Sequence, residues 1–211
     1  MMIKNSLFFC LIIFIYKIAA IFYTNFDFFG DEAQYWIWSQ QIDLGYYSKP
    51  PLLAWLISLI SLIFGDSFQS LKLIPIFMYV FNSYLIYLIL IKIYKNREEA
   101  ILGSCTFFLI PAVTVSSFLI STDVVLIFFW SLSLLFILKI REQPNFYNFF
   151  LLGIFLGLAF LAKYAAIYFL ISFILILFFD LNLRRIFLIK ISNTLIFLIS
   201  LLIVLLPNII W

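Results

Sequence analysis

The chain has 211 residues, of which 66% are hydrophobic, 21% aromatic and only 11% charged. Soluble domains are roughly 45–50% apolar and about 25% charged, so this composition excludes a small soluble globule and indicates a protein whose main solvent is lipid. The net charge of +3 comes from 13 basic and 10 acidic residues that are scattered along the chain, which argues against a nucleic-acid partner.

Seven apolar runs are long enough, or nearly so, to cross a bilayer, for which a helix needs roughly 17–25 residues. We therefore expect an all-α integral membrane protein with about seven transmembrane helices. In chain order the predicted spans are 6–23, 71–91, 100–118, 123–140, 146–162, 165–179 and 191–206. The first span is expected to stay uncleaved, because Lys17 interrupts its core and bulky residues follow Ala19 and Ala20.

The distribution of Lys and Arg predicts the orientation, because short cytoplasmic loops carry the positive excess. With the N-terminus inside, the inner side collects Lys4, Lys92, Lys95, Arg97, Lys139, Arg141, Arg184, Arg185 and Lys190. The outer side then holds Lys49, Lys72 and Lys163, together with the acids Asp27, Asp31, Glu32, Asp43, Asp66 and Asp123. We expect a plasma (inner) membrane protein with a cytoplasmic N-terminus and its first loop on the outer, periplasmic side.

The first outer loop, at about 25–70, concentrates the polar chemistry of the chain. Within it, the run 51–64 is apolar but only 14 residues long, between Pro50 and Gly65. This run is too short to span, so we interpret it as an interfacial or re-entrant helix. No internal repeat, linker or soluble domain interrupts the chain, which predicts one membrane domain over residues 1–211.

An acid pair opens this loop, since Asp31 and Glu32 follow Gly30 and precede a predicted short helix over 33–41. Helical spacing puts the two acids on adjacent stripes of that helix. Two interpretations stay open. Either the acids only complement the positive helix N-terminus, or one carboxylate serves as a general base at the membrane surface.

A cation follows in the motif Tyr46-Tyr47-Ser48-Lys49-Pro50-Pro51. The two prolines hold the backbone extended, so Lys49 is presented on a stiff turn. A Lys at the outer interface suits a phosphate group as a point charge. The alternative is a snorkelling Lys that anchors the next helix.

Two later motifs add polar residues on the predicted outer side. Ser121-Thr122-Asp123 opens the fourth span, where helix capping is a sufficient explanation. Gly153 and Gly157 allow close helix packing. Lys163 follows at the outer end of that helix, where an uncompensated charge is costly, so it is a candidate for a second phosphate contact.

These motifs, in their order and spacing, resemble the integral-membrane glycosyltransferases of the dolichyl-phosphate-mannose protein mannosyltransferase-like superfamily, which includes aminoarabinose (lipid A) transferases. The matching segments are Asp31-Glu32-Ala33-Gln34-Tyr35, Tyr46-Tyr47-Ser48-Lys49-Pro50-Pro51-Leu52, Ser121-Thr122-Asp123 and Gly157-Leu158-Ala159-Phe160-Leu161-Ala162-Lys163-Tyr164. The resemblance implies a GT-C fold with seven membrane helices, a large first outer loop and a polyprenyl-phosphate-linked sugar as donor. Family members usually continue well beyond 211 residues, so we expect an N-terminal fragment or a short member, with a separate C-terminal polypeptide as a candidate partner.

The resemblance also implies roles for single residues. Asp31 resembles the base that takes the proton of the acceptor hydroxyl, with Glu32 beside it. Lys49 resembles the residue that holds the donor phosphate, and Asp123 is a secondary polar contact. Further donor-phosphate contacts are expected from Tyr46, Tyr47 and Lys163.

No cofactor is firmly predicted. Some family members carry an acid directly before the Lys-Pro pair, where this chain has Ser48, so a divalent metal stays an open alternative. His is absent, and Cys10 and Cys105 are far apart in the sequence, which argues against a His or Cys metal site.

Two non-enzymatic classes remain as alternatives. A lipid-linked sugar flippase or a small-solute transporter would place ionisable groups near the bilayer midplane and show repeated halves. Here the acids gather at one face, and no repeat is visible. An inactive subunit remnant would have the same composition as an enzyme, so composition does not separate the two.

Overall fold

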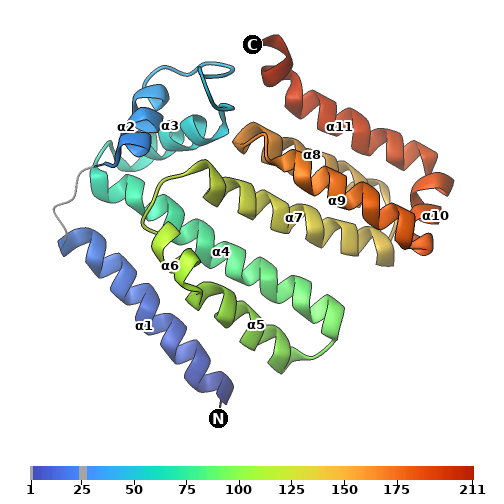
Figure 1. Ribbon diagram of the computed structural model, residues 1–211, viewed down its shortest axis with the longest axis horizontal. Coiled ribbons are helices and arrows are strands. Elements are labelled where there is room, and N and C mark those ends of the chain that lie inside the picture. The colour runs from blue at the N-terminus through green and yellow to red at the C-terminus, as the bar shows by residue number, and fades with distance from the viewer. Residues whose placement is uncertain (1, 24–27) are drawn as a thin grey trace. The chain divides into compact units, whose positions relative to one another are not determined.

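The computed structural model describes residues 2–23 and 28–211, and these residues are helical throughout apart from turns (Figure 1). The helices are α1 (Met2–Tyr23), α2 (Gly30–Ser39), α3 (Leu52–Phe64), α4 (Phe68–Tyr94), α5 (Arg97–Leu109), α6 (Pro111–Ser116), α7 (Thr122–Glu142), α8 (Phe146–Ala162), α9 (Ala166–Phe179), α10 (Leu181–Ile189) and α11 (Ile191–Ile210). The predicted all-α class is thus confirmed. Asp27 and the side chain of Lys4, both used in the predicted orientation, lie outside the described residues.

Four helices are long and apolar enough to cross a membrane: α1 from Ser6, α4, α7 and α11. The count rises to five if α9 and α10, which meet at a bend of 101°, form one broken span. Helices α3 and α8 are apolar but shorter. The described residues therefore support an integral membrane protein, and they do not show the seven spans expected from the sequence.

The third predicted span, 100–118, is wrong as a continuous helix. Helix α5 ends at Leu109 and a separate short helix, α6, begins at Pro111. Proline lacks a backbone N–H and its ring clashes with the preceding turn, so it stops one helix and is well placed at the first position of the next. Hydropathy alone did not register this break, because the residues on both sides are apolar.

The chain forms two compact units. The first unit consists of Met1–Ile42 and Leu53–Phe128, and the second of Asp43–Leu52 and Phe129–Trp211. The first unit thus holds α1 to α6 and the start of α7. The second holds the rest of α7, helices α8 to α11, and a short segment of the first loop.

In the first unit α4 packs against α5, and α1 packs against both. Asn96 caps the start of α5 and Ser67 caps the start of α4. Lys17 of α1 is completely buried, and its Nζ lies 4.1 Å from the centroid of the Phe108 ring on α5. The Lys that interrupts the first apolar run therefore faces a neighbouring helix.

In the second unit α8 and α11 run parallel and in close contact, because small residues of α8 face α11. A Cβ on Gly153 would overlap Ser200, and a Cβ on Gly157 would lie 2.7 Å from Cβ of Val204. The expectation that these glycines serve helix packing is confirmed. Around this contact lies a core of aromatic and aliphatic side chains, in which Phe187 of α10 sits 4.8 Å, centroid to centroid, from Phe149 of α8.

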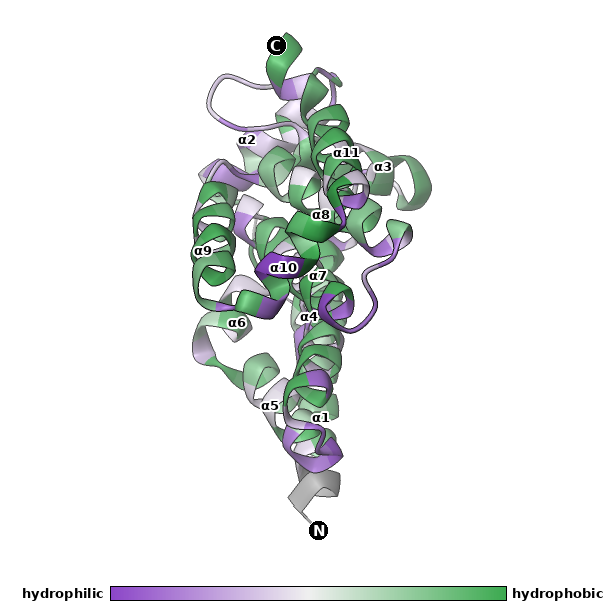
Figure 2. Cartoon of the chain, turned by 90° about the vertical axis from the view of Figure 1, so that its right-hand side faces the viewer, coloured by the Kyte–Doolittle hydropathy of each residue, from purple (hydrophilic) through white to green (hydrophobic). Residues whose placement is uncertain are grey.

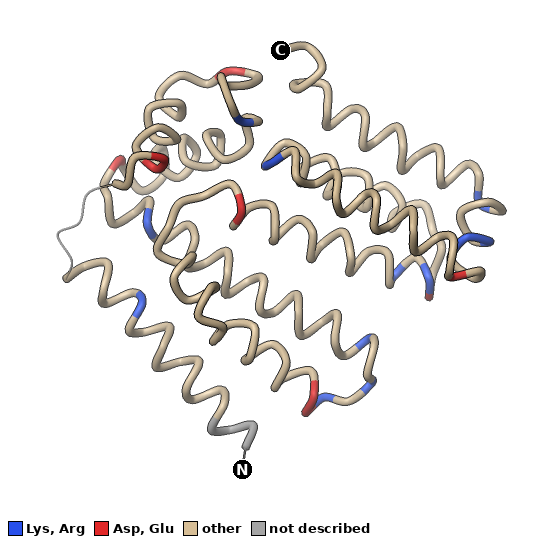
Figure 3. The backbone as a smooth tube through the Cα atoms, viewed as in Figure 1, with Lys and Arg blue, Asp and Glu red and all other residues tan. Residues whose placement is uncertain are grey.

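The helices expose many large apolar side chains, and the hydropathy colouring in Figure 2 shows that hydrophobic residues make up most of their length. Charged residues stand mainly at helix ends and in turns (Figure 3). A soluble protein would hide such apolar faces, whereas lipid solvates them. The polar groups at the helix ends are therefore the candidates for a functional site.

Candidate functional site

The acid pair lies at the start of α2, and its two members have opposite surroundings. Glu32 is buried, with 2% of its surface exposed. Its Oε2 accepts a hydrogen bond of 2.9 Å from the backbone N–H of Phe29, directly before the helix. This bond satisfies one of the free donors that every helix start leaves, so Glu32 helps to fix where α2 begins.

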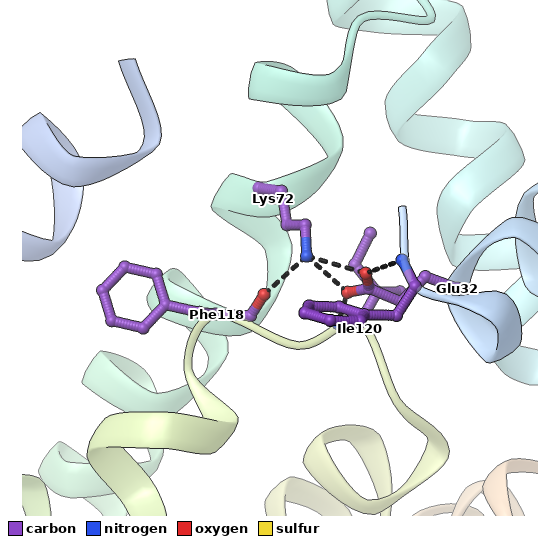
Figure 4. Close-up of polar contacts among 5 residues, drawn as sticks. Glu32, Lys72, Phe118 and Ile120 are labelled. Carbon is purple, nitrogen blue, oxygen red and sulfur yellow. Dashed lines mark hydrogen bonds and ion pairs between the residues drawn. The ribbon is translucent and has the colours of Figure 1, made fainter. Parts of the chain in front are cut away.

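Glu32 is also ion-paired with Lys72, near the start of α4 (Figure 4). The Nζ of Lys72 lies 2.6 Å from Oε1 and 2.8 Å from Oε2, and it donates a third hydrogen bond of 2.7 Å to the carbonyl of Phe118. The backbone N–H of Ile120 donates to Oε1 of Glu32 at 2.7 Å. Both buried charges are thereby paired and hydrogen-bonded, which is the condition for a buried ion pair to be tolerated.

This cluster of Glu32, Lys72, Phe118 and Ile120 ties three separate segments together. They are the start of α2, the start of α4 and the connection that leads from α6 into α7. Lys72 was predicted to lie on the outer side, and no partner was predicted for it. The position of Lys72 at the beginning of an apolar span could have indicated an ion pair, because a charged side chain within a membrane span needs an opposite charge.

Asp31, the neighbour of Glu32, is exposed. Among the residues that the structure describes, none donates a hydrogen bond to its carboxylate. Its electrostatic influence reaches Tyr35, one turn later on the same predicted stripe. Burial raises the pKa of Tyr35, the Asp31 carboxylate raises it further, and a hydrogen bond with the side chain of Thr122 lowers it.

Asp123, at the start of α7, acts on the same tyrosine, since its carboxylate also raises the pKa of Tyr35. The two acids predicted from separate motifs are therefore near one phenol in the first unit. Asp31 and Asp123 are both exposed, while Tyr35 is buried. The structure thus brings three predicted acids, Asp31, Glu32 and Asp123, into one region.

The C-terminal half of α2 is held by Asp66, in the turn between α3 and α4. Its carboxylate accepts hydrogen bonds from Nε1 of Trp36 at 2.8 Å, from Ser61 at 2.8 Å and from Gln40 at 3.2 Å. These bonds, that of Trp36 above all, lower the pKa of Asp66. Helix α2 is therefore anchored at both ends, by Glu32 and by Asp66.

An apolar pocket of about 450 Å³ lies beside the buried ion pair, within the first unit. Lys72 and the aromatic rings of Phe29 and Phe68 form part of its wall, and residues of α1, of α6 and of the connection after α6 form the rest. Its lining is almost entirely apolar. Such a pocket suits a hydrocarbon chain better than a sugar.

Lys49 lies in the second unit, on a tight turn. The backbones of Tyr46 and Lys49 exchange two hydrogen bonds, of 3.1 and 3.2 Å, and the prolines that follow are buried. The turn predicted at Lys49 is thus present. Its side chain is half-buried.

The two tyrosines of that turn differ. Tyr46 is buried, its hydroxyl accepts a 3.2 Å hydrogen bond from the backbone N–H of Asp43, and burial raises its pKa. Tyr47 is almost fully exposed. Tyr46 therefore braces the turn, and Tyr47 is open to a ligand.

Lys163 follows the last residue of α8 and is half-buried. Because α8 and α11 run parallel, the end of α8 lies at the same end of the second unit as the end of α11. The ring of Trp211 there packs so closely on Gly45 that an added Cβ would lie 2.5 Å from Cδ2. Lys163 and the turn of Lys49 are therefore at one end of that unit.

The acids and Lys72 belong to the first unit, and Lys49, Tyr46, Tyr47 and Lys163 to the second. Across the described residues, no three Asp, Glu or Cys side chains come together as a group that could hold a metal ion.

Comparison with known proteins identifies the family. Residues 48–211 match the dolichyl-phosphate-mannose-protein mannosyltransferase family, a range that includes Lys49, Asp123 and Lys163 and begins after Asp31. The chain is 35% identical over 159 residues to the lipid A galacturonosyltransferase RgtD of Rhizobium johnstonii, an alignment that covers 73% of this chain.

The chain spans about a third of the length of that relative, of which the alignment covers 33%. No solved structure gives a significant match. The resemblance read from the motifs is confirmed by the family match over most of the chain. The chain belongs to the dolichyl-phosphate-mannose-protein mannosyltransferase family of GT-C membrane glycosyltransferases.

Proposed function

We propose that this chain transfers a sugar from a polyprenyl-phosphate-linked donor to a lipid, glycan or protein acceptor at the outer face of the membrane. The observation that carries the proposal is the contrast within the acid pair. Glu32 is locked in a buried ion pair, while the adjacent Asp31 is exposed at the start of the same helix. Family membership supports the reaction class, and the name of the relative supports a lipid acceptor as one option.

Asp31 is the proposed general base. A sugar bound to a phosphate already carries a good leaving group, so the step that needs help is deprotonation of the acceptor hydroxyl. A base must be reachable and held in place. Asp31 is exposed, and the hydrogen bonds and ion pair of Glu32 fix the backbone from which it projects. Glu32 is a positioning residue in this proposal, and Asp123 is a secondary polar contact.

Lys49 is the proposed partner of the departing phosphate, which gains negative charge as the glycosidic bond breaks. Lys163 and the exposed Tyr47 are proposed as further contacts, and Tyr46 shapes the turn. The apolar pocket beside Phe29 and Lys72 offers room for hydrocarbon from a lipid substrate.

Replacing Lys49 is expected to weaken donor binding. Lys49→Ala removes the charge and Lys49→Glu reverses it, so the dissociation constant for a polyprenyl-phosphate sugar should rise in that order. Lys49→Arg should rescue only in part, because a planar guanidinium differs from a compact ammonium. Binding of a fluorescent polyprenyl-phosphate sugar to reconstituted protein measures the effect.

Lys95→Glu is the matched control, since Lys95 is exposed in the turn after α4 and has no part in the proposed site. Equal donor affinity in Lys49→Glu and in the unchanged protein would contradict the proposal and show that Lys49 is only a membrane anchor.

The proposed topology has the N-terminus in the cytoplasm, following the nine-to-three excess of Lys and Arg on the inner side. Reporter fusions after Asn96 and after Asn182 should report the cytoplasm, and a fusion after Asp43 should report the outer side. An outer signal at Asn182 would mean that α8 and α9 do not each cross the membrane.

The enzyme and the non-enzymatic alternatives differ in one measurement. Membranes that contain the chain should release labelled sugar from the lipid-linked donor and transfer it to an acceptor. A flippase would move the intact donor across vesicles with the sugar still attached. Transport of intact donor without sugar release would refute the proposed reaction.

A further inference from the structure

Helices α9 and α10 form the one pair of apolar helices in the described residues that is sharply bent at a short break. The function proposed above makes no use of α10. Helix α10 follows α9 at a bend of 101°, and Asp180 stands at the bend. The carboxylate of Asp180 caps α10 by accepting a 3.0 Å hydrogen bond from the N–H of Leu183. The change of direction is thus stabilised by a specific cap.

Both ends of α10 are tied to the boundaries of membrane-spanning helices. At its start, Asp180 is ion-paired at 3.5 Å with Arg141, in the last turn of α7. At its end, Lys190 leads directly into α11, and the Thr194 hydroxyl of α11 donates a 2.7 Å hydrogen bond to the carbonyl of Phe187. Since α7 and α11 are both candidate spans, α10 connects the end of one candidate span with the start of another.

The inner face of α10 is fixed to the core of the second unit. Leu183 and Phe187 are buried, and Phe187 contacts Phe149, Phe173 and Phe197 on three other helices. These contacts hold α10 in place, so its outer face has a defined direction.

The outer face combines apolar and basic side chains. Leu181, Leu188 and Ile189 are 63%, 66% and 65% exposed, and Arg184 and Arg185 are exposed between them. A face turned to water would not carry three large exposed aliphatic residues in nine, whereas the headgroup region of a bilayer accepts both kinds of group. Arg is well matched to a phosphate, because its planar fork can donate two hydrogen bonds to it.

The surrounding charge favours an anion. The last turn of α7 and helix α10 with its two cap residues hold five basic residues, Lys139, Arg141, Arg184, Arg185 and Lys190, against the two acids Glu142 and Asp180. Asp180 is already engaged by Arg141, which leaves Arg184 and Arg185 as the basic pair on the outer face.

We infer that α10 lies in the membrane surface and binds an anionic phospholipid, with Arg184 and Arg185 holding the headgroup phosphate and the aliphatic residues of the same face reaching the acyl chains. The site is independent of the proposed glycosyl transfer. In the proposed topology it faces the cytoplasmic leaflet.

The test measures which lipids the protein retains. The chain is reconstituted in phosphatidylcholine vesicles that contain a minority of phosphatidylglycerol, extracted with its annular lipid, and its bound lipids are quantified by mass spectrometry. We expect enrichment of phosphatidylglycerol over its share in the vesicle. In Arg184→Gln/Arg185→Gln the enrichment should fall by about tenfold or more, since each basic residue near an anionic surface contributes measurably.

Lys92→Gln/Arg97→Gln is the matched control, because it removes the same number of charges at the end of α4 and the start of α5, in the first unit. It should keep the enrichment, and Arg184→Lys/Arg185→Lys should keep part of it. An equal loss in the control, or no loss in the Arg184 and Arg185 variant, would overturn the inference. Displacement of the lipid by millimolar inorganic phosphate would also overturn it, by showing a site for a free anion.

Discussion

Asp31→Asn is expected to lower turnover by about 10²–10⁴-fold, the usual contribution of a general base. The amide keeps the shape of the side chain but does not take up the proton of the acceptor hydroxyl. Donor binding should change little, because the proposed phosphate contacts lie elsewhere in the chain. Sugar release from a labelled lipid donor, followed in membranes that contain each variant, measures the effect as a fall in kcat with KM nearly constant.

The competing explanation for Asp31 is that it only complements the positive N-terminus of α2 from within its first turn. In that case the substitution would cost only a few tenths of a kcal/mol and leave turnover almost unchanged. Asp43→Asn provides a matched control, since Asp43 is another exposed acid of the first loop and has no part in the proposed chemistry. Normal sugar transfer by Asp31→Asn would remove Asp31 from the mechanism.

Glu32→Gln is expected to destabilise the protein by about 3–5 kcal/mol, the usual cost of removing one partner from a buried ion pair. The amide still accepts one hydrogen bond, from Phe29 or Ile120, but it leaves the ammonium of Lys72 buried without an opposite charge. Lys72→Gln should cost a similar amount for the converse reason. The variants are compared by thermal unfolding in detergent. The fraction of protein that stays monodisperse is measured against temperature, and its midpoint gives the stability of each variant.

The double variant Glu32→Gln/Lys72→Gln separates a true pair from two independent side chains. Two neutral amides can still hydrogen-bond to each other and to Phe118, so the double variant should be more stable than the sum of the single losses predicts. It should also regain part of the turnover, because the start of α2 is held again. Strict additivity in both readouts would show that the pair does not position Asp31.

Hydropathy located most helices of this chain because apolar runs are a local property. The helix predicted at 146–162 coincides with α8, and the spans predicted around α4, α7 and α11 differ from them only at their ends. The short helix α10 was not predicted, and the span predicted at 100–118 is divided into two helices at Pro111. That break depends on backbone geometry, which a hydropathy pattern does not register.

The candidate site was predictable in its residues but not in its connections. The motifs indicated Asp31, Glu32, Asp123 and Lys49, and the spacing indicated the short helix that carries the acids. The partner of Glu32 lies 40 positions away on another helix. A contact between residues so far apart in the chain produces no periodic pattern in the sequence. Helix spacing correctly separated the two acids into neighbouring stripes, but burial does not follow the stripes, since Tyr35 on the stripe of the exposed Asp31 is buried as Glu32 is.

The close pairing of α8 with α11 has a consequence for how the chain is assembled. The Ser200 hydroxyl of α11 donates a hydrogen bond to the carbonyl of Phe150, 50 residues earlier, so the ribosome must complete the intervening helices before this contact exists. Until then, the groove left by Gly153 and Gly157 faces lipid, and the short helix α8 lacks its main partner. This half of the protein therefore acquires its tight packing late, as helices associate within the membrane after their insertion.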